Sequence, residues 1–126
     1  EKIDSLFRKK KYTTISKENF EIIIEGMEQV VESPKGTAHN IFNQDITICG
    51  KTGTAQNPHG EDHSVFIAFA PKKNPKIAIA VYIENGGWGS EWAAPISSLM
   101  IEKYLNIETN KILENFILSG NLITKK

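Results

Sequence analysis

The apolar residues of this chain recur at helical spacing near both ends and form strand-like runs in the middle. From 17 to 33 the spacing predicts a helix, with Ser16 as its N-cap and with Pro34 and Gly36 ending it. The apolar positions of this helix are Phe20, Ile23, Ile24, Met27, Val30 and Val31. A second helix is expected from about Ser90 to Leu105. The buried stripe expected for it consists of Trp92, Ile96, Leu99, Met100 and Leu105.

Three short apolar runs between these helices predict strands. The run 46–49 leads into the sequence GKTGTAQ, and two further runs cover 64–70 and 76–84. The links between the runs are short and rich in Asn, Pro and Gly, which is typical of an antiparallel meander. The third run is apolar at nearly every position, so we expect helices to cover both faces of the sheet.

Length and composition fit one domain, and the order of helix, three strands and helix predicts the α+β class. We divide the 126 residues into an irregular segment (1–15), a core (16–105) and a tail (106–126). Apolar positions in the tail predict a further short helix; they are Ile112, Leu113, Phe116 and Ile117. Fifteen basic residues balance fifteen acidic ones, which gives no support for a nucleic-acid partner. No stretch reaches the ~18 apolar residues of a membrane-spanning helix.

The sequence Cys49-Gly-Lys-Thr-Gly-Thr-Ala at 49–55 is the main candidate for chemistry, and a phosphate-binding loop is the first interpretation to weigh. A P-loop requires a glycine five residues before its Gly-Lys-Thr, where this chain has Asp45. A P-loop also opens a helix, whereas Pro58 and Gly60 follow here. A nucleotide site is therefore disfavoured. Cys49 is flanked by apolar strand residues and is interpreted as a small core residue, not as a nucleophile.

A metal site is the second interpretation. His59 and His63 are four residues apart with Glu61 and Asp62 between them. Such spacing chelates a metal when it lies on a helix, but Pro58 and Gly60 argue against a helix there. We interpret this segment as a solvated loop and expect no metal.

Acyl transfer is the third interpretation and agrees best with a strand edge. Lys51 would attract an anionic carboxylate, and the Thr52 hydroxyl would bind it. Gly53 would let an acyl-peptide lie against the strand backbone, and the Thr54 amide would face a developing oxyanion. Lys-Thr-Gly is one of three motifs of penicillin-binding proteins and serine β-lactamases.

The order of several motifs strengthens this interpretation. GKTGTAQ is followed by DHSVFIAFAP, by NPKIAIAVYIENGG and by a helix that begins EWAAPI. Over roughly 12–105 this series resembles the C-terminal part of a penicillin-binding protein transpeptidase domain, most closely of the class B, elongation-type penicillin-binding protein 2. The helix at 17–33 and the following Gly36-Thr37-Ala38 also resemble the segment that precedes the motif strand in that family.

The resemblance implies an incomplete domain. The three strands would be the third, fourth and fifth strands of the family's sheet, flanked by an N-terminal and a C-terminal helix. Lys51, Thr52 and Gly53 would form the third active-site motif, and Thr54 would supply an oxyanion-hole amide. The outer edge of the last strand (76–84) would need a cover, for which we expect 1–15, the tail or another chain.

The family's nucleophile is the serine of Ser-x-x-Lys, and no serine of this chain has a lysine three residues later. Ser119-Gly120-Asn121 matches the second motif, Ser-x-Asn, but follows the closing helix instead of preceding Lys-Thr-Gly, so we interpret it as a chance match. We therefore expect this chain to carry the substrate-binding strand without the nucleophile or its lysine, and to be inactive alone.

The resemblance further implies what the intact protein does. It would cross-link peptidoglycan stem peptides ending in D-Ala-D-Ala through an acyl-enzyme, and β-lactams would acylate it. It would need no metal or organic cofactor. It would work on the extracytoplasmic (periplasmic) face of the cell membrane, held by an N-terminal anchor outside this chain, beside a membrane glycosyltransferase of the elongation machinery.

Two alternatives remain open from the sequence. A serine β-lactamase or penicillin-sensor fragment shares Lys-Thr-Gly and differs in the rate at which it turns over β-lactams. A non-catalytic module that binds peptide carboxylates in the same groove would bind D-Ala-D-Ala peptides reversibly, without a covalent adduct.

Overall fold

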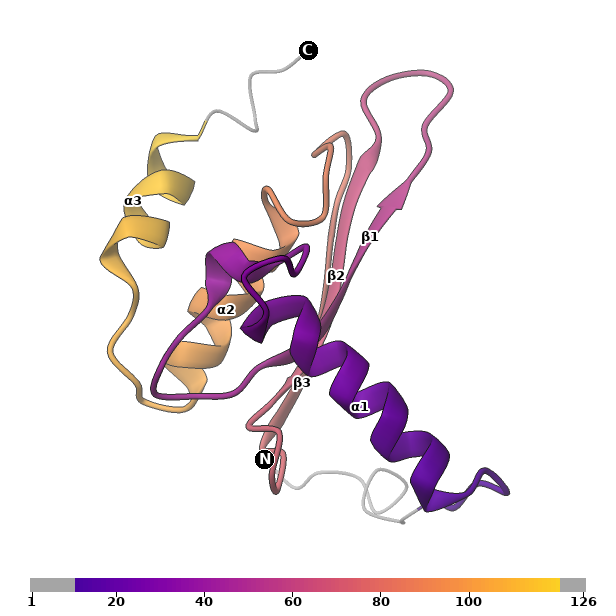
Figure 1. The fold of residues 1–126 in the computed structure, drawn as a ribbon. Helices are drawn as coiled ribbons and strands as arrows, with labels where there is room; N and C mark the ends of the chain where they lie inside the picture. The colour runs from indigo at the N-terminus through magenta and orange to yellow at the C-terminus, as the bar shows by residue number, and fades with distance from the viewer. Residues whose placement is uncertain (1–10, 121–126) are drawn as a thin grey trace, which may run out of the picture.

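The computed structural model describes residues 11–120 and shows a three-stranded sheet with helices (Figure 1). The helices are α1 (Lys17–Glu32), the 3-10 helix η2 (His39–Ile41), α2 (Ala93–Tyr104) and α3 (Lys111–Ser119). The strands are β1 (Cys49–Ala55), β2 (His63–Ala70) and β3 (Ile77–Ile83). This confirms the predicted α+β class and the order of elements. The run 46–48 precedes β1 instead of belonging to it, so the strand begins three residues later than its apolar pattern suggested.

The sheet is the predicted antiparallel meander, with strand order β1-β2-β3. Lys51 pairs with Ile67, and Phe66 pairs with both Thr52 and Val81. One edge of the sheet is therefore β1 and the other is β3, and no described residue pairs with either outer edge.

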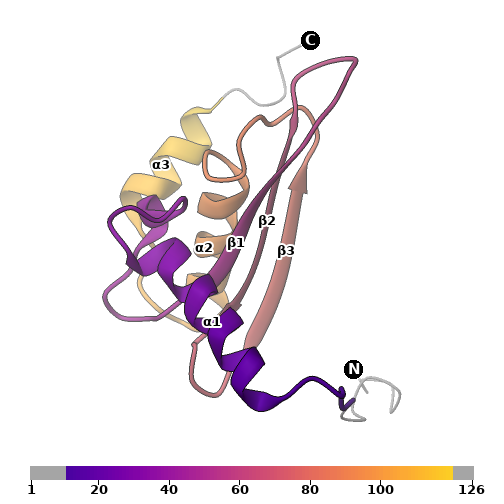
Figure 2. The same cartoon turned by 45° about the vertical axis from the view of Figure 1, so that its right-hand side comes forward.

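The helices do not cover both faces of the sheet, which corrects the sequence-based expectation. They gather on one side (Figure 2), where α2 contacts β2 and β3 while α1 contacts β1. On the other face Ile67 and Tyr82 are 48% and 55% exposed. The apolar character of 76–84 was misleading because Ala78 and Ala80, which alternate with the covered isoleucines, are exposed in the part of the chain described here.

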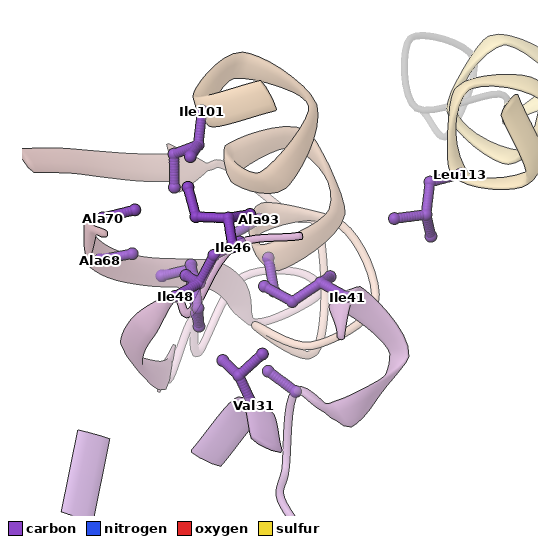
Figure 3. Packing of buried hydrophobic residues seen from close by; sticks show 12 residues of the cluster. Val31, Ile41, Ile46, Ile48, Ala68, Ala70, Ala93, Ile101 and Leu113 are labelled. Carbon is purple, nitrogen blue, oxygen red and sulfur yellow. The ribbon is translucent and has the colours of Figure 1, made fainter. Parts of the chain in front are cut away.

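The core lies between the sheet, α2 and the segment that joins α1 to β1 (Figure 3). Phe66, Ile48, Ile41 and Ile101 are its largest apolar members and are at most 1% exposed. Burying side chains of this size stabilises by roughly 1.5–3 kcal/mol each. The remaining buried apolar residues of this cluster are Val31, Ala38, Ile46, Ala68, Ala70, Ala93, Ala94 and Leu113.

Helix α2 is buried through small residues more than through the predicted stripe. Ser97 and Ser98 are fully buried, whereas Met100 is 52% exposed, so its prediction as a core residue was wrong. Glu102 is also buried; its carboxylate accepts hydrogen bonds from Asn43 Nδ2, Ser98 Oγ and the Asn110 amide. Small side chains let α2 lie close to the sheet, and the buried carboxylate is satisfied by these donors.

The tail forms the predicted short helix, α3, which packs on α2. Asn110 caps it by accepting from the amides of Ile112 and Leu113. Trp92 stacks on Phe116 with 5.0 Å between ring centroids. The tail as far as Gly120 therefore does not cover the outer edge of β3. Of the expected segment 1–15, residues 11–15 pair with no strand and residues 1–10 lie outside the described residues, and a cover by another chain stays a prediction.

Helix α1 begins at the predicted N-cap, since Ser16 Oγ accepts from the Asn19 amide. Its C-terminal end is buried at Val31, whereas Phe20, Ile22 and Ile23 near its start remain 42–65% exposed. No helix within 11–120 has the length and apolar character needed to cross a membrane.

Candidate functional site

The four predicted site residues lie together on the outer edge strand β1. Lys51 and Thr54 are exposed, while Thr52 and Gly53 are half-buried. Lys51 Nζ donates to the Thr52 carbonyl at 2.7 Å, so the ammonium lies along the strand edge. Because β2 occupies the other side of β1, this edge is the side from which an extended peptide could approach.

Gly50 and Gly53 flank Lys51 and Thr52, and the two glycines differ in the space around them. A Cβ added at Gly50 would lie 2.3 Å from Phe66 Cζ, an impossible contact inside the core. A Cβ added at Gly53 would meet Val65 Cβ at 3.4 Å, close to ordinary contact. Internal packing therefore explains glycine at 50 and leaves glycine at 53 to be explained by what approaches from outside.

Thr52 meets a side chain from a distant part of the chain. Thr37, between α1 and η2, places its Oγ1 3.0 Å from Thr52 Oγ1. The flanking residues hold this segment in place. The Ala38 amide donates to the Val30 carbonyl at 2.9 Å, and a Cβ at Gly36 would lie 2.3 Å from the same oxygen.

The loop between β3 and α2 closes the site from one face of the sheet. Gly89 lies so close to the strands that an added Cβ would be 2.3 Å from the Val65 carbonyl and 2.5 Å from that of Gly53. Buried Ser64 fixes the loop: its hydroxyl donates to the Trp88 carbonyl and accepts from the Ala93 amide. Asn40 Nδ2 also donates to the Ser90 carbonyl.

A hollow of about 470 Å³ lies beside Thr54, between the β1–β2 turn and this loop. Its lining includes Glu61, Asp62, Trp88 and Glu91. A larger hollow of about 740 Å³ lies at the Glu28–Lys72 ion pair and includes none of the four predicted site residues. We place the candidate site at the β1 edge because the charged and hydroxyl groups meet there.

Three other sequence candidates, Cys49, His63 and Ser119, make contacts within the fold. Cys49 is fully buried, and burial raises the pKa of its thiol to about 11, with a further increase from the nearby Glu28 carboxylate. His63 opens β2 and accepts from the Asn85 amide through Nδ1. Ser119 ends α3, and its hydroxyl donates to the Phe116 carbonyl.

Sequence reasoning did not assign a role to Thr37, Asn40, Ser64 or Gly89. The first of these lies in Gly36-Thr37-Ala38, which was noted only as a resemblance. Ser64 lies in DHSVFIAFAP, which resembles the family without indicating a role for this serine, and Asn40 and Gly89 lie in none of the quoted motifs. Hydrogen bonds of Asn40 and Ser64 join residues 24 to 50 positions apart. For Gly89, no pattern in the sequence predicts that the strand backbone passes so close.

Comparison with known proteins agrees with the geometry. The family model described as the penicillin binding protein transpeptidase domain matches residues 7–102. The chain is 37% identical to peptidoglycan D,D-transpeptidase MrdA of Haemophilus influenzae, covering 64% of this chain and 15% of the relative.

Solved structures give the same result for the fold. PBP2 of Pseudomonas aeruginosa, in complex with WCK 5153, superimposes with a TM-score of 0.67 at 42% identity, covering 71% of this chain and 20% of that one. PBP2 of Helicobacter pylori gives a TM-score of 0.63 at 30% identity, and the match covers 75% of this chain and 18% of that one. The chain thus spans between a seventh and a fifth of these relatives' lengths. The chain belongs to the penicillin-binding protein transpeptidase family and covers only part of that domain.

Proposed function

We propose that the protein carrying this chain is a serine-type peptidoglycan D,D-transpeptidase and that the β1 edge holds its donor peptide. The observation that carries the proposal is the open strand edge on which Lys51, Thr52 and Gly53 follow one another. The Thr37 hydroxyl lies beside this edge, 3.0 Å from Thr52 Oγ1. The ammonium and the Thr52 hydroxyl suit the terminal carboxylate of a D-Ala-D-Ala stem peptide.

The donor's reacting carbonyl would lie next to Thr54. In an antiparallel ladder alternate residues direct their backbone groups to the same edge, so the Thr54 amide shares the direction of the Thr52 carbonyl, which accepts Lys51 Nζ. An amide so placed stabilises the oxyanion that forms when a serine oxygen attacks the carbonyl. Lys51 to Thr54 therefore bind and polarise the substrate, while a serine outside these 126 residues attacks it.

The reaction has two steps. The serine oxygen forms an ester with the penultimate D-alanine, the amide bond between the two D-alanines breaks, and D-alanine leaves with a proton on its amine. The amine of a second stem peptide then attacks the ester, an amide cross-link forms and the serine is released. A β-lactam would react in the first step in the same way.

A relative in a complex supports a proposal for the setting of the intact protein. Helicobacter pylori PBP2, which is 29% identical to this chain with a TM-score of 0.63, has been solved in complex with MreC. We propose an elongation-type assembly for the intact protein, with a membrane glycosyltransferase as partner. An anchor outside this chain would hold it at the extracytoplasmic face of the membrane. The outer edge of β3 would pair with other strands of the same domain or with another chain.

Labelling with a fluorescent penicillin tests the proposal. The intact protein is expected to label covalently, and K51A and T52V are expected to lower the labelling rate by at least tenfold. K103A, which removes an exposed lysine on α2, is the matched control and should label normally. The 126-residue chain should stay unlabelled. Labelling of the chain alone, or full labelling of K51A and T52V, would refute the assignment.

The same experiment separates the alternatives. Rapid loss of the label with regain of free enzyme would identify a β-lactamase. Saturable binding of a D-Ala-D-Ala peptide without any covalent label would identify a carboxylate-binding module.

A further inference from the structure

Thr37 contacts the candidate site although it lies 15 residues before Thr52. Thr37 is exposed, as are Lys51 and Thr54. The distance between Thr37 Oγ1 and Thr52 Oγ1 is 3.0 Å, within the range of a hydrogen bond between hydroxyls. No other hydrogen bond of the Thr52 hydroxyl is found within residues 11–120.

The chemistry of the two hydroxyls decides which one donates and which one accepts when substrate is bound. A threonine hydroxyl has one hydrogen and can accept through its lone pairs, whereas an ionised carboxylate can only accept. Thr52 can serve the carboxylate only by donating its single hydrogen to it. Its oxygen is then free to accept the hydrogen of Thr37.

We propose that Thr37 is a positioning residue for carboxylate recognition. It donates to Thr52 Oγ1, fixes the rotamer of Thr52 and directs the Thr52 hydrogen to the carboxylate of the donor peptide or β-lactam. Hydrogen bonds in such a chain polarise one another, so the Thr52 hydroxyl becomes a stronger donor. This inference rests on the proposed function and names a residue that acts on the substrate through Thr52.

The backbone around Thr37 is built to hold it. The Gly36 amide donates to the Ser33 carbonyl at 2.7 Å, and Ala38 is fully buried with its amide bound to the Val30 carbonyl. Both neighbours of Thr37 are therefore fastened to the last turn of α1. Thr37 is free to point outward while its Cα stays fixed, which lowers the entropy cost of holding the hydroxyl in place.

The test compares two ligands in the intact protein, benzylpenicillin and its methyl ester, in which an uncharged ester replaces the carboxylate. T37V should slow acylation by the acid about fivefold to tenfold, the loss expected for one hydrogen bond. It should leave acylation by the ester within about twofold of the unmodified protein. T37S keeps the hydroxyl and should restore the acid rate, while T109V is the matched control away from the site.

A double variant adds an independent criterion. If Thr37 acts through Thr52, then T37V combined with T52V should be no slower than T52V alone. The inference is overturned if T37V slows acid and ester alike, if its effect adds to that of T52V, or if T37V changes nothing while T52V slows the acid. If T52V also leaves the acid rate unchanged, the proposed function itself fails. Because Thr37 is exposed, T37V is expected to fold, and the ester rate reports whether the site remains intact.

Discussion

The two ends of β1 differ in burial and in what surrounds them. Cys49 and Gly50 are buried and lie against the core, whereas Lys51 and Thr54 are exposed on an open edge. One strand is therefore both a structural element of the core and a surface for a ligand. The change occurs within a single residue step, because α1 contacts β1 near its start and leaves the rest of the edge uncovered (Figure 2).

The motif alone does not reveal why a glycine is needed at each of its positions. Gly50 and Gly53 look equivalent in Gly-Lys-Thr-Gly, yet among contacts within residues 11–120 only those at Gly50 require a glycine. The distinction can be tested with the same small substitution at each position.

The largest effect on stability is expected for G50A. The added methyl would lie 2.3 Å from the ring of buried Phe66, so the ring or the strand must shift. Overpacking of this kind costs about 1–3 kcal/mol in the free energy of unfolding. Chemical denaturation measures it. A G50A variant as stable as the unmodified protein would show that the first half of β1 is not as tightly packed as described.

The next effect concerns Cys49 and the pH dependence of stability. Burial raises the pKa of this thiol to about 11 in the folded protein, above its value in the unfolded chain. The stabilisation is fully present below the unfolded pKa. It is lost as the pH rises from about 9 through 11, because only the unfolded chain releases the proton there.

Denaturation curves of the unmodified protein and C49A across that pH range isolate this contribution. The unmodified protein should lose more stability than C49A on going from pH 8 to pH 11. In addition, iodoacetamide should alkylate Cys49 slowly until the protein unfolds. Rapid alkylation at neutral pH would contradict the burial of this half of the strand.

A smaller change of opposite sign is expected for G26A, which serves as the control for G50A. Gly26 lies on the exposed side of α1, and an added Cβ would meet nothing within 4 Å. Replacing a helical glycine with alanine stabilises by about 0.5–1 kcal/mol. In the same denaturation experiment, the free energy of unfolding should therefore rise for G26A and fall for G50A.

The smallest effect on stability is expected for G53A, together with a large effect on function. Its methyl fits at 3.4 Å from Val65 Cβ, so the free energy of unfolding should change by at most about 0.5 kcal/mol. The methyl would occupy the surface where a peptide backbone approaches, so penicillin labelling of the intact protein should fall at least tenfold. Unchanged labelling would remove the functional explanation for this glycine.

Much of the fold followed from local patterns. Ser16 and Pro34 bounded α1 to within two residues, and the three strands were found where β-rich runs alternate with turn residues. The coverage of the sheet was not predictable, because alternating Ile and Ala in β3 give an apolar run whether one face is covered or two. Met100 was misplaced for a related reason: the buried side of α2 consists mainly of small residues together with Ile101 and Glu102, and Met100 lies outside it.

The sequence by itself determined which residues could bind a carboxylate and an oxyanion, because Lys51 to Thr54 are consecutive and their types and order carry that chemistry. Only the tertiary structure decided what surrounds them. It brought Thr37 Oγ1 to 3.0 Å from Thr52 Oγ1. It also placed Gly89 against the backbone of Gly53 and the Phe66 ring against Gly50. These contacts join residues 15 or more positions apart, and no local propensity fixes them. They arise when the helices and the sheet bury a common core.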